Sequence, residues 1–151
     1  MEAANGTRGM SCMNAVDTNV FVYALDDDEP IKQAKANELL VRLAQYPSDT
    51  ILLWQVATEF LSVLRRWEDA GRVATADVVE NFRDVRSMFT LRLPRIRTFR
   101  ISEGLRLRFS LSHWDSMLLA ACKEAGVDVL YSEDMDSGTD YDGLRIVNPF
   151  A

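Results

Sequence analysis

The sequence predicts an α/β fold built around a central parallel sheet. Short apolar runs typical of buried strands alternate along the chain with longer segments in which apolar residues recur at helical spacing. Strands separated by helices pair in parallel, and the helices then cover both faces of the sheet. Five strand-like segments are present, so we expect three layers around a sheet of about five strands.

The first third of the chain predicts a strand, a short helix and a longer helix. Residues 13–17 ("MNAVD") form a short apolar run that stops at a carboxylate, and residues 19–25 ("NVFVYAL") predict the short helix. An acidic cluster then leads to Pro30, which suits the first position of a helix because its φ is already helical. The longer helix is expected to cover residues 30–45.

The middle of the chain repeats this pattern. Residues 50–54 ("TILLW") predict a second strand after a break at Pro47. Residues 56–71 predict a helix that stops at a glycine, a residue that readily adopts the left-handed conformation found at helix ends. Residues 75–89 predict another helix, with Thr75 as its N-cap.

The last third is expected to hold three strands and two helices. Residues 95–101 ("RIRTFRI") alternate between apolar and polar side chains, which favours a strand. Residues 102–109 predict a short helix, and residues 112–126 predict a longer one that ends at a glycine. The apolar run at residues 127–132 ("VDVLYS") and residues 144–147 ("LRIV") supply the last two strands.

Length and composition fit one domain. The chain has 151 residues, of which 48% are hydrophobic and 26% charged, enough for a single core. Residues 1–12 ("MEAANGTRGMSC") lack any apolar period, so we expect a flexible N-terminal extension followed by one domain at residues 13–151. No apolar run could span a membrane, no signal peptide is recognisable, and two cysteines make no disulfide framework, so a cytoplasmic location is expected.

The charge is distributed unevenly. The net charge is −6, but residues 64–108 carry eleven arginines against six acids, a local balance of +5. This segment could offer phosphates a positive surface; on charge alone, however, solvated helix faces explain the arginines better. The candidate RNA-binding residues are Arg65, Arg66, Arg72, Arg83 and Arg86.

Carboxylates stand where the predicted strands end. Asp17 closes the first strand, and Asp134 and Asp136 follow the fourth. Asp115 lies in the first turn of a helix, in a "SHWD" segment with the spacing of a capping box. Each acid also has an ordinary structural interpretation, as a helix cap or a polar turn. In a parallel sheet, however, the carboxyl ends of the strands lie at one edge, where sites form.

Glu59 borders an apolar helix face. It lies three residues after Val56 and four before Val63, so it is expected to face inward beside the buried stripe. A carboxylate in that position is costly unless it is paired or bound to a cation. An arginine such as Arg65 is the alternative partner.

Asp17, Glu59, Asp115 and Asp134 are therefore expected to meet in one cleft. Four carboxylates in one cleft repel each other and raise each other's pKa values. A divalent cation removes this conflict, and a set of oxygen ligands favours Mg²⁺ or Mn²⁺. Such an ion activates water as a nucleophile and stabilises the charge that develops on a phosphoryl oxygen. The four acids thus predict hydrolysis of phosphodiester bonds.

Other chemistries find little support in the sequence. His113 is the single histidine, which excludes a histidine-based zinc cluster and the HExxH motif. No glycine-rich phosphate loop is present, which argues against a nucleotide-binding kinase or dehydrogenase.

The chain carries five motifs in a fixed order: "VDTNVFVYAL", "ATEFLSVL", "LSHWDSMLLAA", "LYSEDMDSG" and "DGLRIVNPF". In this order they resemble the motifs of PIN domains, and most closely those of the VapC-like toxin ribonucleases of toxin–antitoxin systems. The resemblance extends from Met13 to Phe150. Each motif is weak alone, but five in order with compatible spacing form a specific signal.

The resemblance implies a three-layer α/β/α PIN fold and a Mg²⁺- or Mn²⁺-dependent ribonuclease, the toxin of a toxin–antitoxin pair. It also implies a cognate antitoxin that enters the active-site groove, and a homodimer. By the motif matches, the acidic quartet would be Asp17, Glu59, Asp115 and Asp134, with Thr18, Asn19 and Ser132 orienting carboxylates or waters. Similar sequences often carry another residue at Asp136, so its role as a further ligand is left open.

Two alternative functions belong to classes other than ribonuclease. One is a PIN-fold module that binds protein and has little nuclease activity; an intact acidic quartet disfavours it. The other is an aspartyl-phosphate phosphatase, which also places an aspartate after the first strand. That chemistry needs a second acid two residues later, where this chain has Asn19.

Overall fold

A six-stranded sheet organises residues 12–151, the part of the chain that this computed structural model describes. The expected extension at residues 1–12 lies outside the described residues, apart from Cys12. The strands follow the order β3-β2-β1-β4-β6-β5. Five run in parallel: β1 (Asn14–Val16), β2 (Thr50–Leu53), β3 (Thr90–Arg92), β4 (Val129–Tyr131) and β6 (Leu144–Val147). The short β5 (Asp140–Tyr141) pairs with β6 in the antiparallel direction.

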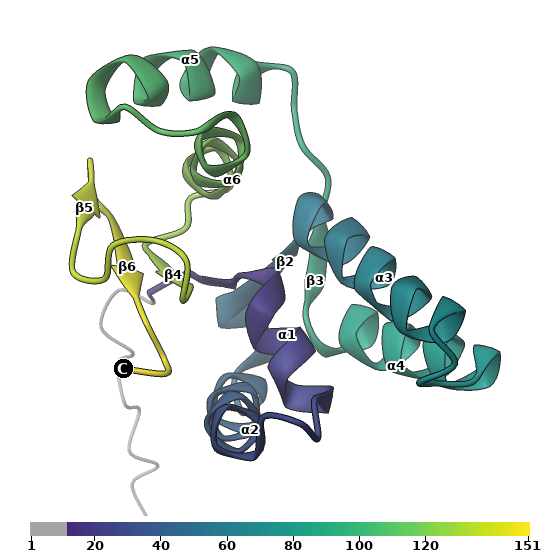
Figure 1. The fold of residues 1–151 in the computed structure, drawn as a ribbon. Coiled ribbons are helices and arrows are strands. Elements are labelled where there is room, and N and C mark those ends of the chain that lie inside the picture. Colours follow the sequence, from purple (N-terminus) through teal and green to yellow (C-terminus); the bar gives the residue numbers. More distant parts are fainter. Residues whose placement is uncertain (1–11) are drawn as a thin grey trace, which may run out of the picture.

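The helices form two groups around this sheet, one of α5 and α6 and the other of α1 to α4 (Figure 1). In the view of Figure 1, α5 and α6 lie above the sheet, α1 and α2 lie below it, and α3 packs against α4 at the β3 end. Their bounds are α1 (Thr18–Leu25), α2 (Pro30–Ala44), α3 (Trp54–Asp69), α4 (Thr75–Met88), α5 (Arg97–Phe109) and α6 (His113–Glu124). The predicted α/β class with a mostly parallel sheet is confirmed. Within residues 12–151, no helix combines the length and apolarity that crossing a membrane requires.

The apolar core joins both helix groups to the sheet. Val16 and Leu130 of the central strands are buried, and Phe21 of α1 meets Phe60 of α3 with ring centroids 5.9 Å apart. Cys122 is fully buried in α6, where it packs as a small core residue. These contacts fix α1 and α3 on the strands whose ends carry the candidate acids.

The prediction of a strand at residues 95–101 is wrong. This segment opens α5, and the short helix predicted at residues 102–109 is the second half of the same helix. The buried positions of α5 are Thr98, Ser102 and Leu105, which follow helical spacing. The alternation was misleading because two of its apolar residues face solvent: Ile96 is 87% exposed and Phe99 is 61% exposed.

Three smaller features also differ from expectation. The edge strand β3 is only three residues long, too short to show a period in the sequence, and β5 has only two residues. The N-cap of α4 is Ala74 and not Thr75. Ala74 has no side-chain oxygen, and its own N–H instead donates to the Asp77 carboxylate at 2.9 Å.

Strand register places the candidate site. Val16 of β1 pairs with Tyr131 of β4, so the next residues along each strand, Asp17 and Ser132, become neighbours at the carboxyl edge. The β2 strand, on the other side of β1, leads directly into α3. Acids that are far apart in the sequence therefore approach one another at this edge.

Candidate metal centre

Asp17 is held at the edge by two hydrogen bonds. Its Oδ1 accepts from the backbone N–H of Thr18 at 2.7 Å, and its Oδ2 accepts from the Ser132 hydroxyl at 2.8 Å. Asp17 is also the N-cap of α1 and is only 8% exposed. Capping of α1 and binding of a metal ion are therefore compatible in geometry.

Ser132 joins the two central strand ends. Its side chain is fully buried; the hydroxyl donates to Asp17 and accepts from the backbone N–H of Asp134 at 3.3 Å. One oxygen thus sets both the orientation of a carboxylate on β1 and the path of the loop that follows β4. This contact is a direct consequence of the register between the two strands.

Thr18 and Asn19, the residues after Asp17, reach two of the other three acids. The Thr18 hydroxyl donates to Glu59 Oε2 at 2.8 Å, and the Asn19 amide donates to Asp134 Oδ2 at 2.6 Å. Thr18, Asn19 and Ser132 therefore each donate to one candidate metal ligand, which is the geometry expected of residues that orient carboxylates.

Glu59 differs in part from its predicted setting. It is exposed and does not face inward, while its neighbours Val56 and Phe60 form the buried stripe of α3. Within residues 12–151 no arginine forms an ion pair with Glu59. Its second oxygen instead accepts from the Gln55 amide at 3.2 Å, one helical turn earlier. Sequence reasoning overlooked Gln55, although its i, i+4 spacing to Glu59 was visible.

One pocket gathers three of the four acids. It has a volume of about 330 Å³ and is lined by Asp17, Thr18, Asn19, Glu59, Ser62, Val63, Arg66 and Asp134. Asp115 does not line this pocket, but after burial and the charge of Glu133 its negative charge is a smaller cause that raises the pKa of Asp134. Asp136 is exposed; its charge acts on Tyr141, and it does not line the pocket.

The electrostatics of the pocket favour a cation. Burial is the main cause that raises the pKa of Asp17, and the charges of Asp134 and Glu59 raise it further, against the two hydrogen bonds that lower it. Burial also raises the pKa of Asp134, with the charge of its neighbour Glu133 as the next cause. A bound cation would favour the ionised form of both acids.

The donor set fits a hard divalent ion, although the carboxylates stand some distance apart. Among residues 12–151, no group of three or more acids, histidines or cysteines stands close enough to hold a metal ion as the side chains lie. The acids that line the pocket offer oxygens alone, and beside the larger effect of burial the charges of Asp134 and Glu59 both raise the pKa of Asp17. Oxygen ligands with room for several waters are what Mg²⁺ requires.

Lys32 is a further residue near the site that the motifs did not reveal. Its ammonium contacts Glu133 at 2.5 Å and the Tyr23 hydroxyl at 3.2 Å, so it ties the loop after β4 to α1 and α2. Because Glu133 precedes Asp134, this contact helps to fix the loop that carries the acid.

The model of the PIN domain family matches residues 15–138, a span that includes all four candidate acids. The chain belongs to the PIN domain family. No curated protein sequence matches it. Membership in this family of nucleases gives no support to the aspartyl-phosphate phosphatase alternative.

Three solved structures of similar fold are a toxin or toxin–antitoxin complexes. A toxin–antitoxin complex from Klebsiella pneumoniae has a TM-score of 0.64 at 16% identity, covering 90% of this chain and 97% of that one. VapBC2 from Rickettsia felis, bound to promoter DNA, has a TM-score of 0.66 at 12% identity, covering 89% and 96%. VapC20 from Mycobacterium tuberculosis, a toxin that cleaves the sarcin–ricin loop, has a TM-score of 0.59 at 16% identity, covering 82% and 91%. At these identities the likeness shows a shared PIN fold.

The raised pKa of Asp17 predicts how stability depends on pH without a metal. The folded state holds the Asp17 proton more tightly than the unfolded state, in which the pKa is near the ordinary 3.8. This contribution is fully present below pH 3.8 and is lost as pH rises through the folded-state value. In EDTA, wild type should therefore lose stability relative to Asp17→Asn across that range. Urea unfolding of both proteins at several pH values measures the difference, and a constant difference would contradict the assigned burial.

Proposed function

We propose that this PIN domain protein is a Mg²⁺- or Mn²⁺-dependent ribonuclease and the toxin of a toxin–antitoxin pair. The observation that carries the proposal is the pocket at the carboxyl edge, where Asp17, Glu59 and Asp134 come together from three elements. Each of these acids accepts a hydrogen bond from Thr18, Asn19 or Ser132. Repulsion between neighbouring carboxylates costs free energy, the burial of Asp17 adds to that cost, and a cation offsets both.

Asp17 and Asp134 would hold the metal ion, with Glu59 and Asp115 completing the acidic site around it. A divalent ion in such a site activates water and stabilises charge on a phosphoryl oxygen. Thr18, Asn19 and Ser132 keep the carboxylate oxygens aimed at the pocket, which limits the rearrangement needed when the ion binds.

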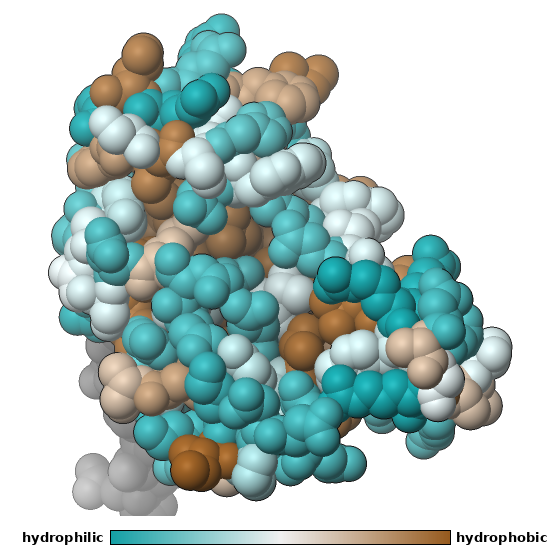
Figure 2. Space-filling model, viewed as in Figure 1, coloured by the Kyte–Doolittle hydropathy of each residue, from teal (hydrophilic) through white to brown (hydrophobic). Residues whose placement is uncertain are grey.

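Arginines continue from the acidic pocket along α3 and α4. Arg66 lines the acidic pocket itself, and Arg65, Arg83 and Arg86 line a neighbouring groove between the two helices. Figure 2 shows a hydrophobic floor between α3 and α4 with strongly hydrophilic side chains on both sides. A polyanion that extends from the acidic pocket along this groove would meet these guanidinium groups, which favour phosphate.

Arg72 is set apart from this group. Its guanidinium pairs with Asp26 at 2.5 Å and Asp28 at 3.1 Å, and it stacks over the Trp67 ring with 4.2 Å to the centroid. Its charge is already compensated within the protein. Arg72 therefore serves as a structural link between α3 and the loop before α2, and it does not belong to the proposed RNA contacts.

Neutralising the groove should reduce the salt dependence of RNA binding. Replacing Arg65, Arg66, Arg83 and Arg86 together with glutamine should weaken binding of single-stranded RNA. Each lost phosphate contact should flatten the slope of log K against log salt by about 0.7. Fluorescence anisotropy at several salt concentrations measures both effects.

Arg72→Gln is the matched control, because it removes the same charge from a paired position. It should lower the melting temperature and leave the salt slope unchanged. An unaltered slope in the fourfold variant would mean that the groove is an ordinary solvated surface.

The partners follow from the same proposal. Two of the structural neighbours are toxin–antitoxin complexes, which supports a cognate antitoxin for this chain, and we propose a homodimer in the cytoplasm. Size-exclusion chromatography with light scattering tests the dimer. Co-purification with the product of an adjacent gene tests the antitoxin.

A direct assay tests the activity. Purified protein free of antitoxin should degrade RNA with Mg²⁺ or Mn²⁺ and should be inactive in EDTA. If a folded wild-type protein shows no metal-dependent cleavage of total cellular RNA, the nuclease proposal is wrong, and the protein-binding module becomes the better account.

A further inference from the structure

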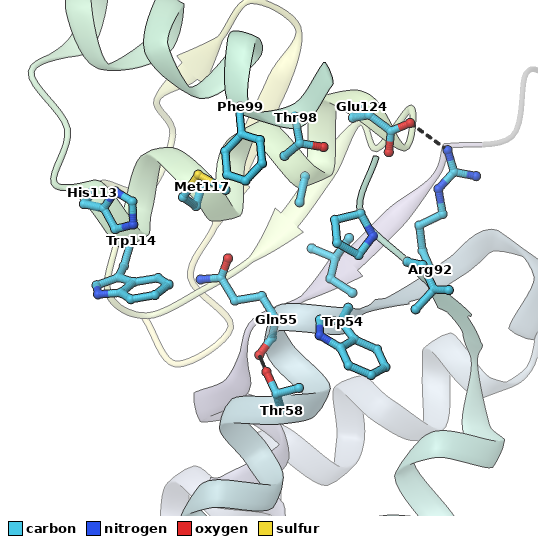
Figure 3. A pocket seen from close by; sticks show the side chains of 14 residues that line it. Trp54, Gln55, Thr58, Arg92, Thr98, Phe99, His113, Trp114, Met117 and Glu124 are labelled. Carbon is cyan, nitrogen blue, oxygen red and sulfur yellow. Dashed lines mark hydrogen bonds and ion pairs between the residues drawn. The ribbon is translucent and has the colours of Figure 1, made fainter. Parts of the chain in front are cut away.

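A second pocket, separate from the acidic one, opens between two parts of the fold. It has a volume of about 390 Å³, within the range of small-ligand sites. The start of α3 and the β3–α5 connection form one side, and α5 and α6 form the other (Figure 3). His113, Trp114 and Met117 belong to one of the family motifs, but the proposed acidic centre does not account for this pocket.

Aromatic side chains line the pocket and remain accessible. Trp114 is 66% exposed, Phe99 is 61% exposed and Trp54 is 47% exposed, although all three are large and apolar. His113 packs edge-on against Trp114, with ring centroids 4.7 Å apart, and so supports the indole from one side. Flat, exposed rings that are held in place are suited to stack on another flat ring.

Polar atoms without partners also belong to this pocket. Thr98 Oγ1 and Arg92 Nε are buried and have no hydrogen-bond partner among the described residues. Both residues line the pocket, and Thr98 is only 3% exposed. An unsatisfied buried donor or acceptor is costly, which indicates a ligand with polar atoms at its edge.

The pocket adjoins the acidic centre. Gln55 lines it and donates a hydrogen bond to Glu59, which lines the acidic pocket. Trp114, which also lines the pocket, is followed in the chain by Asp115, and the charge of Asp115 is one of the smaller causes, after burial, that raise the pKa of Asp134. A chain bound at the acidic centre would therefore have its next unit beside these aromatic rings.

Three arginines gather around Glu124, a residue that lines the pocket. The Glu124 carboxylate is almost completely buried, and Arg92, Arg95 and Arg97 stand 3.0, 3.5 and 3.8 Å from it. One carboxylate faces three guanidinium groups: Arg92 lines the pocket, whereas Arg95 and Arg97 lie outside its lining with side chains 64% exposed. This combination suits an aromatic ligand that carries phosphate.

We propose that this pocket takes an unpaired nucleobase of the RNA, the one next to the bond that is cut. The inference rests on the proposed ribonuclease function and extends it to single-stranded substrate. The aromatic rings stack on the base, Thr98 and Arg92 meet its polar edge, and the two exposed arginines meet the flanking phosphate. An apolar peptide side chain would leave the Thr98 hydroxyl and Arg92 Nε unpaired, so a base fits better than a protein partner.

Binding of short RNA in EDTA, where no cleavage occurs, tests the proposal. The probe is a fluorescein-labelled hexanucleotide of a single base, together with versions that carry one abasic ribose at each position in turn. Trp114→Ala and Trp54→Ala should each weaken binding roughly tenfold, because stacking on one base changes affinity by about five- to a hundredfold. At one position of the hexanucleotide, loss of the base should weaken binding to the wild-type protein by a similar factor. The same abasic hexanucleotide should bind Trp114→Ala almost as well as the intact one does, because the stacking contact is already lost in that variant.

Three further variants sharpen the test. Trp114→Phe keeps an aromatic ring and should restore most of the affinity. Thr98→Val removes the unpaired hydroxyl, so it should weaken RNA binding several-fold without lowering the melting temperature. Leu107→Ala removes an apolar side chain that is 87% exposed and lies outside this pocket, so it should change nothing.

The outcomes separate the two proposals. If wild type cleaves RNA with metal and binds the hexanucleotide, but the tryptophan variants bind equally well, only the base pocket is wrong. The base-pocket proposal is also wrong if the losses of RNA-binding free energy caused by the tryptophan substitution and by the abasic position are additive. It is likewise wrong if the variants no longer dimerise or no longer bind a partner protein but keep their affinity for RNA. If wild type neither binds nor cleaves RNA, both proposals fail.

Discussion

Asp17→Asn and Asp134→Asn should each lower the rate of RNA cleavage by about a thousandfold or more, with the fold intact. Asparagine keeps the size and one oxygen of aspartate but lacks the negative charge that holds a cation. A metal ion contributes several kcal/mol to such a reaction, and each 1.36 kcal/mol corresponds to a factor of ten in rate. Cleavage of a labelled RNA with Mn²⁺, and Mn²⁺ binding by calorimetry, measure the loss.

Stability separates this prediction from a purely structural role. In EDTA both variants should be as stable as wild type or more stable, because each removes a member of a repelling group whose pKa is raised by burial. Asparagine also caps helices about as well as aspartate. If Asp17 served only as the cap of α1, Asp17→Asn would be nearly silent in every assay.

Two isosteric controls belong beside these variants. Asp136→Asn should be milder, because Asp136 is exposed and does not line the acidic pocket. Asp128→Asn changes an aspartate at the opposite end of β4, where it accepts from the Met13 N–H at 2.9 Å, and should leave cleavage unchanged. Full activity and unaltered Mn²⁺ affinity in Asp17→Asn would defeat the metal-centre proposal.

Ser132→Ala should weaken Mn²⁺ binding and cleavage by about ten- to a hundredfold, the usual effect of losing a residue that orients a metal ligand. Its hydroxyl is the contact that joins Asp17 to the backbone of Asp134. Without it, the Asp17 carboxylate loses a hydrogen bond that lowers its pKa, so cleavage should also require a higher pH. A pH–rate profile alongside Mn²⁺ titration measures both changes.

Ser102→Ala is the matched control for Ser132→Ala. Ser102 is also a buried serine, but its hydroxyl donates to the Phe99 carbonyl within α5, away from the acids. Both variants should lose similar stability, while only Ser132→Ala should lose metal affinity. Equal metal affinity in the two would show that the Ser132 contact merely supports the fold.

Several local features could be predicted from the sequence because they depend on nearby residues. Pro30 begins α2 as predicted, and Ser112 caps α6 by accepting from the Asp115 N–H at 3.2 Å. Gly71 and Gly126 follow α3 and α6 with φ values of 72° and 75°, the left-handed conformation that their positions required. The prediction of 95–101 as a strand failed, because an alternating pattern does not reveal which side chains the rest of the protein covers.

The sequence by itself determined that acids follow the strands of a parallel sheet, and that the chain carries the motifs of PIN domains. Only the tertiary structure decided which of these acids share a pocket and which side chains bind them. The register of β1 and β4 places Ser132 against Asp17. The packing of α3 brings Glu59 within hydrogen-bonding distance of Thr18, and Arg72 forms an ion pair with Asp26. The aromatic pocket likewise combines α3 with α5 and α6. Periodicity and capping act over one or two helical turns, whereas these contacts join residues far apart in the chain, and only packing of the whole domain fixes them.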